Sequence, residues 1–371
     1  MSAAEERRAQ IYRESLENYL RPISGFLRDS SVTEILINGP NEIFIERAGK
    51  LMRTDVRFSS DDELLVAINN IAQSVRRRID ESNPRMDARL PDGSRIHVVL
   101  PPVARNGATV AIRKFSQTEI TFKKYLEFGA ITPDAAQFLD VCMFLGKNIL
   151  VSGGTGSGKT TLLGILCNRI PKGQRIIVIE DATELKIHYE HVVFFEARMP
   201  DAEGKGAVTI EDLLKSSLRL RPDRIIVGEV RGSEAYDLIQ AMNTGHKGCL
   251  GTVHSNTPAD ALVRLEALAQ GAGDNISIKA LQQQIGSAID LVVQVSRLSD
   301  GSRKVTDITE VHGVDDKGNY ITSDIYKMGQ LIRGEGGKLS GSIQPVGNIP
   351  KFMNEIEDNR IPFPRTKFNA A

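Results

Sequence analysis

The chain has 371 residues, which is enough for two or three domains that each bury a sizeable core. Lys and Arg together number 47, as do Asp and Glu, so the formal net charge is zero and no overall field draws the chain to nucleic acid or to an acidic membrane surface. No apolar run reaches the roughly 18 residues of a membrane span, and the first residues lack the apolar core of a signal peptide. The three cysteines are too few and too widely spaced for a disulfide framework. We therefore expect a cytoplasmic protein without a membrane span.

The N-terminal third has the pattern of a small α+β domain. Residues 7–29 carry apolar side chains at helical spacing, which predicts an amphipathic helix within a leading segment, 1–29. Two short strands, 34–38 and 42–46, are joined by Gly-Pro-Asn, a hairpin signal. Further along, the pattern predicts a helix over 61–77 and strands over 95–100 and 109–113. We expect these elements to form one domain over residues 30–114.

The rest of the chain alternates strands with helices. A linker is expected over 115–135, with Pro133 in the first turn of a helix that continues over 134–145. Strands are predicted over 149–152, 175–179, 224–228, 249–253 and 291–295. This alternation indicates an α/β domain, residues 136–313, with a mostly parallel sheet covered on both faces. Glycines become dense after residue 314, so 314–371 is expected to be an appendage.

The most specific motif is GGTGSGKT at 153–160, placed between the apolar run 149–151 and a helical pattern over 160–170. Glycines allow several backbone N–H groups to converge on one phosphate, and the helix N-terminus adds partial positive charge there. Lys159 is expected to reach the β- and γ-phosphates, and the Thr160 hydroxyl to bind Mg²⁺. A glycine-rich turn that matched this motif by chance would not be expected to lie between a strand and a helix. The nucleotide-binding residues are predicted to be Gly153, Gly154, Thr155, Gly156, Ser157, Gly158, Lys159, Thr160 and Thr161, with ATP and Mg²⁺ as ligands.

Polar side chains follow three other predicted strands. Glu180 ends one of them, Glu229 comes just after another, and His254 closes a third. Because ligands bind at the carboxyl ends of strands in an open α/β sheet, these groups should meet the phosphates there. Taken singly, Glu180 could cap a helix, Glu229 could be a surface acid, and either His254 or the nearby His246 could be a structural histidine.

Four motifs in this order resemble those of the secretion-superfamily traffic ATPases. They are GGTGSGKTT (153–161), VIEDATEL (178–185), RPDRIIVGEVRG (221–232) and TGHKGCLGTVHSNTP (244–258), which match that family's Walker A, aspartate box, atypical Walker B and histidine box. The segments 32–46 and 87–102 are also similar to its nucleotide-covering domain. The resemblance covers roughly residues 30–312.

Within the superfamily, the histidine-box variant and the tail most resemble the tight-adherence (Flp) pilus motor of the CpaF type and the conjugation-system ATPases. The four-cysteine zinc insertion of the type II secretion branch is missing, and the N-terminal extension is shorter than in typical CpaF proteins. Pilus assembly and type IV secretion or conjugation therefore both stay open.

The resemblance implies an ATP hydrolase that works as a homo-hexameric ring, with a RecA-like P-loop domain and a smaller N-terminal domain that covers the nucleotide. It favours Glu180 as the base that orients water and Glu229 as a Mg²⁺ ligand through water. These roles could be exchanged, because Gly228 occupies the place of the usual Walker B aspartate. His254 would sense the γ-phosphate. Arginines expected to contact the nucleotide are Arg95, Arg105, Arg113, Arg198 and Arg231.

The resemblance also implies a partner and a location. The motor would act on an inner-membrane platform protein and associate with that membrane through its partners. A RecA-like nucleic-acid translocase is a rival reading, but the zero net charge and the lack of an aromatic–basic segment disfavour nucleic acid as a partner. A third interpretation is a scaffold that binds nucleotide but hardly hydrolyses it. The presence of both Glu180 and Glu229 disfavours this interpretation.

Overall fold

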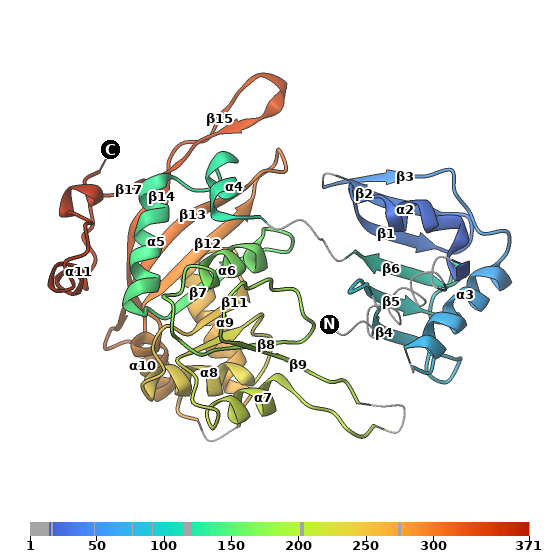
Figure 1. Cartoon of the computed structure of the whole chain (residues 1–371), viewed down its shortest axis with the longest axis horizontal. Helices are drawn as coiled ribbons and strands as arrows, with labels where there is room; N and C mark the ends of the chain where they lie inside the picture. Colours follow the sequence, from blue (N-terminus) through green and yellow to red (C-terminus); the bar gives the residue numbers. More distant parts are fainter. Residues whose placement is uncertain are drawn as a thin grey trace. The chain divides into compact units, whose positions relative to one another are not determined.

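The computed structural model describes residues 15, 18–47, 49–75, 77–90, 92–114, 120–200, 204–273 and 276–370. They fall into two compact units, one within Met1–Glu119 and Pro200–Gly206, the other within Ile120–Met199 and Ala207–Ala371 (Figure 1). Residues 7–14, 16 and 17 of the helix predicted over 7–29 lie outside the described residues. Its end consists of a 3-10 turn, η1 (Arg21–Ile23), and a short helix, α2 (Ser24–Arg28).

The smaller unit is an antiparallel sheet with one covered face. Its strand order is β3-β2-β1-β6-β5-β4. The strands are β1 (Val32–Asn38), β2 (Ile43–Arg47), β3 (Lys50–Arg53), β4 (Arg85–Arg89), β5 (Arg95–Val99) and β6 (Thr109–Arg113). Helix α3 (Asp61–Ser74) begins after Ser60, whose hydroxyl accepts the Glu63 N–H, and its Leu64, Ile68 and Ile71 pack into the same core as the inward strand residues. The predicted hairpin is β1–β2, whereas β3 and β4 were not predicted because they lack a regular apolar alternation.

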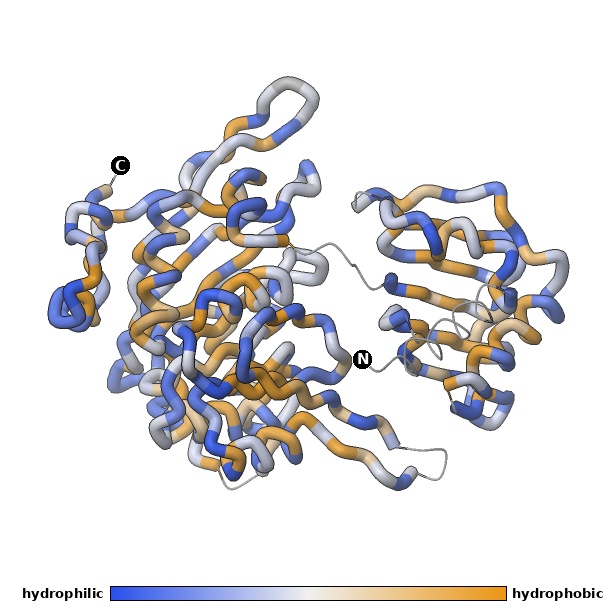
Figure 2. The backbone as a smooth tube through the Cα atoms, in the orientation of Figure 1, coloured by the Kyte–Doolittle hydropathy of each residue, from blue (hydrophilic) through white to orange (hydrophobic). Residues whose placement is uncertain are grey.

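The larger unit is built on a nine-stranded sheet in the order β17-β14-β13-β12-β7-β11-β10-β8-β9. The pairs from β12 to β9 are all parallel, so the predicted parallel sheet is confirmed. These strands are β7 (Ile149–Gly153), β8 (Ile176–Glu180), β9 (Val192–Glu196), β10 (Arg224–Val227), β11 (Leu250–His254) and β12 (Leu291–Arg297). Figure 2 shows that the central strands are strongly hydrophobic, as burial on both faces requires. Strand β9 was not predicted, because its side chains are only partly buried.

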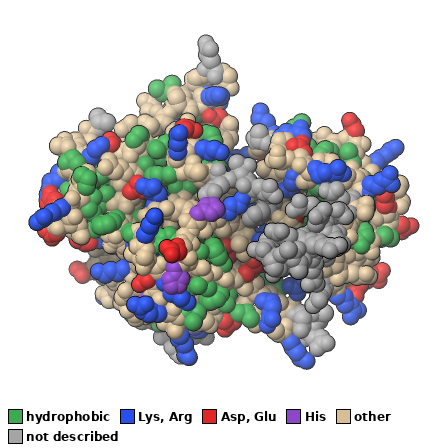
Figure 3. Space-filling view, in the orientation of Figure 1, with side chains coloured by type: hydrophobic (Ala, Val, Ile, Leu, Met, Phe, Trp, Pro, Cys, Tyr) green, Lys and Arg blue, Asp and Glu red, His purple; other side chains and the backbone are tan. Residues whose placement is uncertain are grey.

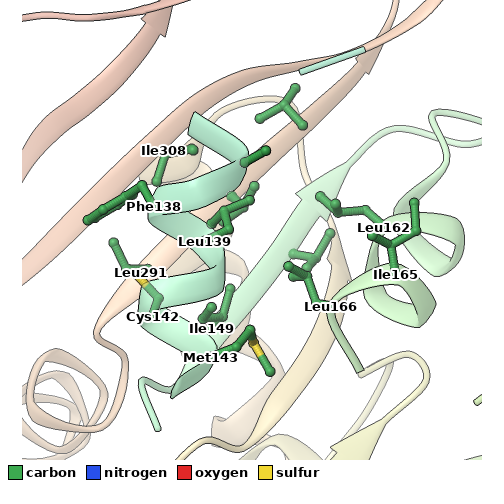
Figure 4. Close-up of a cluster of buried hydrophobic side chains, with 14 of the residues drawn as sticks. Phe138, Leu139, Cys142, Met143, Ile149, Leu162, Ile165, Leu166, Leu291 and Ile308 are labelled. Atoms are coloured by element: carbon green, nitrogen blue, oxygen red, sulfur yellow. The ribbon is translucent and has the colours of Figure 1, made fainter. Parts of the chain in front are cut away.

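Helices cover both faces of this sheet. Successive side chains of β7 point to opposite faces of the sheet. Ile149 and Val151 pack with α5 (Pro133–Leu145) and α6 (Lys159–Cys167), and Leu150 packs with the helices of the other face. That second layer contains α7 (Ile210–Ser217), α8 (Glu234–Asn243), α9 (Pro258–Gln270) and α10 (Ile278–Ala288). Figure 4 shows the α5 and α6 side chains meeting the sheet. Helix α5 has Pro133 in its first turn, as predicted, and ends at Gly146 in a left-handed conformation. The segment expected to be a linker contains helix α4 (Phe122–Glu127).

The last 58 residues contribute to the same core (371 − 313). Strands β13 (Arg303–Val314), β14 (Tyr320–Met328) and β17 (Ile343–Pro345) extend the sheet with antiparallel pairs. Beyond them, α11 (Met353–Asp358) and the 3-10 turn η3 (Arg365–Phe368) follow, and the rings of Phe352, Phe363 and Phe368 lie 5.5–6.0 Å from that of Phe138 on α5. These residues, expected to be an appendage, are thus packed into the larger unit.

Residues 331–340 form a separate two-stranded arm, made of β15 (Ile332–Arg333) and β16 (Leu339–Ser340) joined by the 3-10 turn η2 (Glu335–Gly337). In Figure 1 this arm projects from the body of the larger unit. On the face of the molecule drawn in Figure 3, basic and acidic side chains are interspersed, in keeping with the zero net charge. Among the helices of the described residues, none combines the length and apolarity that crossing a bilayer requires.

Candidate active site

Four neighbouring strands bring the predicted site residues to one edge of the larger sheet. The order β8-β10-β11-β7 is continuous, and all four strands are parallel. Glu180 ends β8, Glu229 comes two residues after β10, His254 ends β11, and Gly153 ends β7. The carboxyl ends of parallel strands thus place all four positions at a single edge, where ligands of α/β proteins bind.

The loop from Gly153 to Lys159 has the backbone of a phosphate-binding turn. Gly156 and Gly158 have φ of +68° and +99°, in the left-handed region that favours glycine. A Cβ on Gly153 would lie 2.3 Å from the Val295 carbonyl oxygen and 2.5 Å from Ser157 Oγ, so no side chain fits there. Helix α6 begins at Lys159, which puts Thr160 and Thr161 in its first turn and directs the helix N-terminus toward the loop.

Lys159 is buried and faces three acceptors. Its Nζ lies 2.9 Å from the Gly153 carbonyl, 3.0 Å from the Gly154 carbonyl and 3.3 Å from His254 Nδ1. A phosphate that enters the loop would compete with these acceptors and offers stronger, charge-assisted bonds in exchange.

His254 connects Lys159 to a chain of charged groups. Because Nδ1 faces the ammonium, the imidazole proton belongs on Nε2, which lies 2.7 Å from Glu229 Oε1. The other Glu229 oxygen accepts from Arg231, whose second guanidinium nitrogen bonds Asp181 at 2.7 Å. Burial, followed by the charge of Lys159, lowers the pKa of His254, which favours the neutral ring. These contacts thus connect the phosphate loop, which is the Walker A motif, to side chains of the other three motifs.

Glu180 is held in a different way. Only 3% of the residue is exposed, and its Oε1 accepts the backbone N–H groups of Glu184 at 2.9 Å and Leu185 at 3.0 Å. Burial raises the pKa of Glu180 to about 7, although the two backbone donors partly oppose this rise. No described residue donates to Oε2. One carboxylate oxygen is therefore anchored, and the other has no donor within the described part of the chain.

The position of Glu180 explains the glycine in the atypical Walker B motif. A Cβ on Gly228 would lie 2.9 Å from Glu180 Cγ, closer than real side chains approach. Gly228 also contributes its carbonyl as acceptor for the Thr252 hydroxyl at 2.7 Å, which fixes the backbone there. Glu180 from the neighbouring strand thus fills the space that an acidic side chain would take in an ordinary Walker B.

Replacing Gly228 with Ala should therefore displace Glu180. We expect kcat for ATP hydrolysis to fall by about 10-fold or more, because small misplacements of a catalytic group have effects of this size. Ala at Gly273, which is exposed after α9 and has no atom within 4 Å of the position that a Cβ would take, is the matched control. Steady-state kinetics of both variants would check this, and wild-type kcat in Gly228→Ala would contradict the steric argument.

The predicted arginines fall into separate groups. In the smaller unit, Arg95 pairs in register with Arg89 on one side and with Arg113 on the other, so the three form a row across β4, β5 and β6. We call Arg89, Arg95 and Arg113 the arginine row; Arg89 is not among the arginines predicted from the sequence. Arg105 lies in the turn between β5 and β6, apart from the row.

The other candidates lie in the larger unit. The Arg198 backbone pairs with Val208, and Arg231 is bonded by Glu229 and Asp181. His246 is not at the nucleotide edge: with Gly146 and Arg224 it lines a pocket at the opposite ends of the strands, and its Nδ1 lies 3.3 Å from the Ala241 carbonyl. Of the two histidines in the histidine box, His254 alone belongs to the site described here.

The donor set at this edge fits a magnesium ion. Thr160 supplies a hydroxyl in the first turn of α6, and Glu229 supplies a carboxylate whose buried Oε1 accepts no hydrogen bond among the described residues. His254 Nε2 lies 2.7 Å from this oxygen, in a contact that is not a hydrogen bond. Hydroxyl, carboxylate and phosphate oxygens are the ligands that Mg²⁺ prefers. These two residues are therefore the ones that would hold the ion.

Comparisons with known proteins agree with this geometry. The family model for type II/IV secretion system proteins matches residues 17–329. Conjugal transfer protein TrbB of Rhizobium radiobacter is 34% identical over 305 residues, covering 81% of this chain and 89% of that protein. Type IV secretion system protein VirB11 of Bartonella quintana is 33% identical over 329 residues, covering 78% and 91%. The crystal structure of the pilus retraction motor PilT with bound ADP superposes with a TM-score of 0.56 at 21% identity, covering 93% of this chain and 86% of that one.

The chain belongs to the family of type II/IV secretion system proteins. Its fold is that of the secretion ATPases, a RecA-like P-loop domain with a smaller N-terminal domain. Family, fold and phosphate-binding loop together make it an ATP hydrolase.

Proposed function

We propose that this chain is a Mg²⁺-dependent motor ATPase of the type IV secretion and conjugation branch, which works as a hexameric ring. The observation that carries the proposal is the chain of contacts from Lys159 through His254 to Glu229, at the edge where β8, β10, β11 and β7 end. Relatives named as conjugal transfer and VirB11 proteins favour this branch over the Flp pilus motor that the tail of the sequence suggested.

Each residue has a distinct part in the proposed reaction. Lys159 and the loop amides bind the β- and γ-phosphates. Thr160 and Glu229 would hold Mg²⁺, and the ion would supply positive charge against the phosphoryl oxygens. The anchored carboxylate of Glu180 orients water through its open Oε2 and takes up the proton. His254, released when Lys159 turns to the phosphates, is then free to sense the γ-phosphate. The contacts seen here would thus be exchanged as ATP binds.

The raised pKa of Glu180 predicts a pH dependence. A base works only when deprotonated, so kcat should fall about 10-fold per pH unit below roughly pH 7 and level off above it. The sign follows from burial, which stabilises the protonated form and places the transition near pH 7 instead of near 4.5. Single-turnover rates between pH 5.5 and 8.5 test this. A flat profile in wild type, or an equal slope in the residual rate of Glu180→Gln, would remove Glu180 from the role of base.

We further propose that the arginine row contacts the nucleotide of its own or a neighbouring subunit. Guanidinium groups stay charged when desolvated and present a rigid fork to phosphate oxygens. Arg95→Ala and Arg113→Ala should each lower kcat/KM for ATP by about 10- to 100-fold. Arg53→Ala is the control, since Arg53 is an exposed arginine of the same sheet that pairs with Glu42. If the arginine-row variants and the control have equal kinetics, the proposal that the arginine row contacts the nucleotide is contradicted.

The partner proposed for the ring is an inner-membrane platform protein, through which this cytoplasmic chain would associate with the membrane. Hydrolysis would move one domain relative to the other through the segment 115–135 and so act on the platform. A chromosomal Lys159→Ala substitution should abolish transfer of the cognate substrate between cells or across the envelope. If transfer persists and surface pili disappear instead, the Flp pilus motor is the better assignment.

Nucleic acid is a separate alternative. A RecA-like translocase would show ATP turnover that rises with single-stranded DNA and collapses as salt increases. The proposed secretion motor predicts turnover that is insensitive to added DNA.

A further inference from the structure

Arg303, the first residue of β13, bonds the back of the phosphate-binding loop. Its Nε donates to the Gly156 carbonyl at 2.8 Å, and its Cδ lies 3.4 Å from the position that a Cβ on Gly158 would take. Arg303 pairs in register with Arg297 at the end of β12, and Arg297 NH1 lies 3.6 Å from the corresponding Cβ position of Gly156. Two arginines of one hairpin thus lie against the two left-handed glycines of the loop.

The bond to Gly156 has a consequence for phosphate binding. The loop binds phosphate through backbone N–H groups, so its carbonyls must point away from the ligand. Gly156 and Gly158 have no side chains to hold them, and glycine loses more conformational freedom on ordering than other residues do. A guanidinium that holds the Gly156 carbonyl on the outer side keeps the loop in the orientation that a phosphate needs.

The hairpin that carries Arg303 is tied to the arm, residues 331–340. Asp300, in the turn between β12 and β13, accepts the Leu339 N–H at 2.7 Å, and the Ser299 hydroxyl accepts from Arg333 at 3.2 Å. Ser302 also donates to Asp300, through its backbone and its hydroxyl, at 2.9 and 2.6 Å. These hydrogen bonds lower the pKa of Asp300 to about 2, so the carboxylate is ionised whenever the protein is folded near neutrality.

The base of the arm is held by the next residue of the same strand. Lys304 is 8% exposed, and its Nζ donates to the Gly129 and Gly341 carbonyls at 3.0 and 2.9 Å. Adjacent residues of β13 therefore fix the arm on one side and the phosphate loop on the other. The arm pairs only with itself as a sheet among the described residues, and Ile332 within it is 62% exposed.

We propose that Arg303 is a positioning residue for the phosphate-binding loop and that the arm sets its position, so that displacement of the arm weakens nucleotide binding. This inference rests on the proposed ATPase function. The path runs from Leu339 through Asp300 and the β12–β13 turn to Arg303 and Gly156, and every step in it is a hydrogen bond or a covalent link. The arm is thereby a control point for the nucleotide site, at a distance from the residues that carry out the chemistry.

Kinetics can separate this role from a structural one. Arg303→Gln should raise KM for ATP and Kd for ADP by about 5- to 10-fold, leave kcat within about threefold, and leave the melting temperature unchanged, because Arg303 is exposed. Arg303→Lys, which retains a charged donor, should recover part of the affinity. Arg365→Gln, an exposed arginine paired with Glu357 in the same unit, should match wild type.

The arm is tested by replacing residues 332–340 with a short Gly-Ser linker. The proposal predicts the same rise in Kd for ADP. It also predicts that a double variant, which combines this replacement with Arg303→Gln, binds ADP no more weakly than the single variant with the lower affinity. Additive effects, or wild-type affinity in either single variant, would overturn it. If wild type itself binds no ADP in calorimetry and behaves like Lys159→Ala, the proposed function has failed and this inference falls with it. If Lys159→Ala abolishes binding and Arg303→Gln leaves it unaltered, this inference alone has failed.

Discussion

Replacing Glu180 with Gln is expected to lower kcat for ATP hydrolysis by about 10²- to 10⁴-fold, the range that a positioned general base contributes. The amide retains the size of the carboxylate and can still accept the N–H groups of Glu184 and Leu185, so the fold should stay intact. It cannot accept a proton from water. ATP should therefore still bind, with an affinity close to that of wild type.

Pre-steady-state turnover and binding of a fluorescent ATP analogue would measure both quantities. Glu190→Gln, the same change at an exposed acid before β9, is the matched control and should hydrolyse ATP normally. If Glu180→Gln cleaves normally and Glu229→Gln does not, the two glutamates exchange roles and Glu229 becomes the base.

Lys159→Ala should abolish hydrolysis, with kcat/KM lowered by at least about 100-fold. The side chain removed is the buried ammonium that bonds the Gly153 and Gly154 carbonyls and faces His254. The backbone of the loop is also held by β7 and by the bond from Arg303 to the Gly156 carbonyl, so the protein should remain folded. His254 loses a neighbouring positive charge in this variant, so its pKa should rise, which a proton NMR titration would detect.

Circular dichroism would show whether Lys159→Ala is folded, and Lys172→Ala, in the exposed turn before β8, provides the control. Wild-type turnover in Lys159→Ala would mean that the glycine loop does not bind the phosphates of the substrate, and the whole assignment of the edge would be lost.

The elements that sequence reasoning placed correctly depend on local patterns. The phosphate loop is continuous in sequence, and its two flanks, β7 and α6, have clear apolar patterns. The edge formed by Glu180, Glu229 and His254 could be predicted because strand ends of a parallel sheet share one side, whatever the strand order. Burial on both faces gave the strands β8 and β10 unbroken apolar runs.

What the sequence did not show depends on partners far along the chain. Gly228 is explained by Glu180, which is 48 residues earlier and one strand away (228 − 180). Arg303 contacts Gly156 across 147 residues, and no local pattern marks that pair. The arginine row is visible only once β4, β5 and β6 are in register, because Arg89 and Arg113 are 24 residues apart in sequence (113 − 89).

The C-terminal segment shows a further physical limit of sequence patterns. Its strands are antiparallel and only partly buried, so β14 has weak apolar alternation although Ile325 and Tyr326 are fully buried in the core. The Gly-rich composition reflects turns and the arm between those strands. Dense glycine therefore indicated irregular connections correctly, but it did not reveal that the connected pieces complete the sheet and cover α5.

The measurement that tests the central claim most directly is Mg²⁺-dependent ATP hydrolysis per subunit over a wide range of protein concentration, with the particle mass recorded in parallel. A ring motor whose sites are completed by neighbouring subunits predicts turnover per subunit that rises steeply with concentration as hexamers form. A flat and robust rate from monomers would mean that each chain carries its whole site, and the hexameric motor would be contradicted.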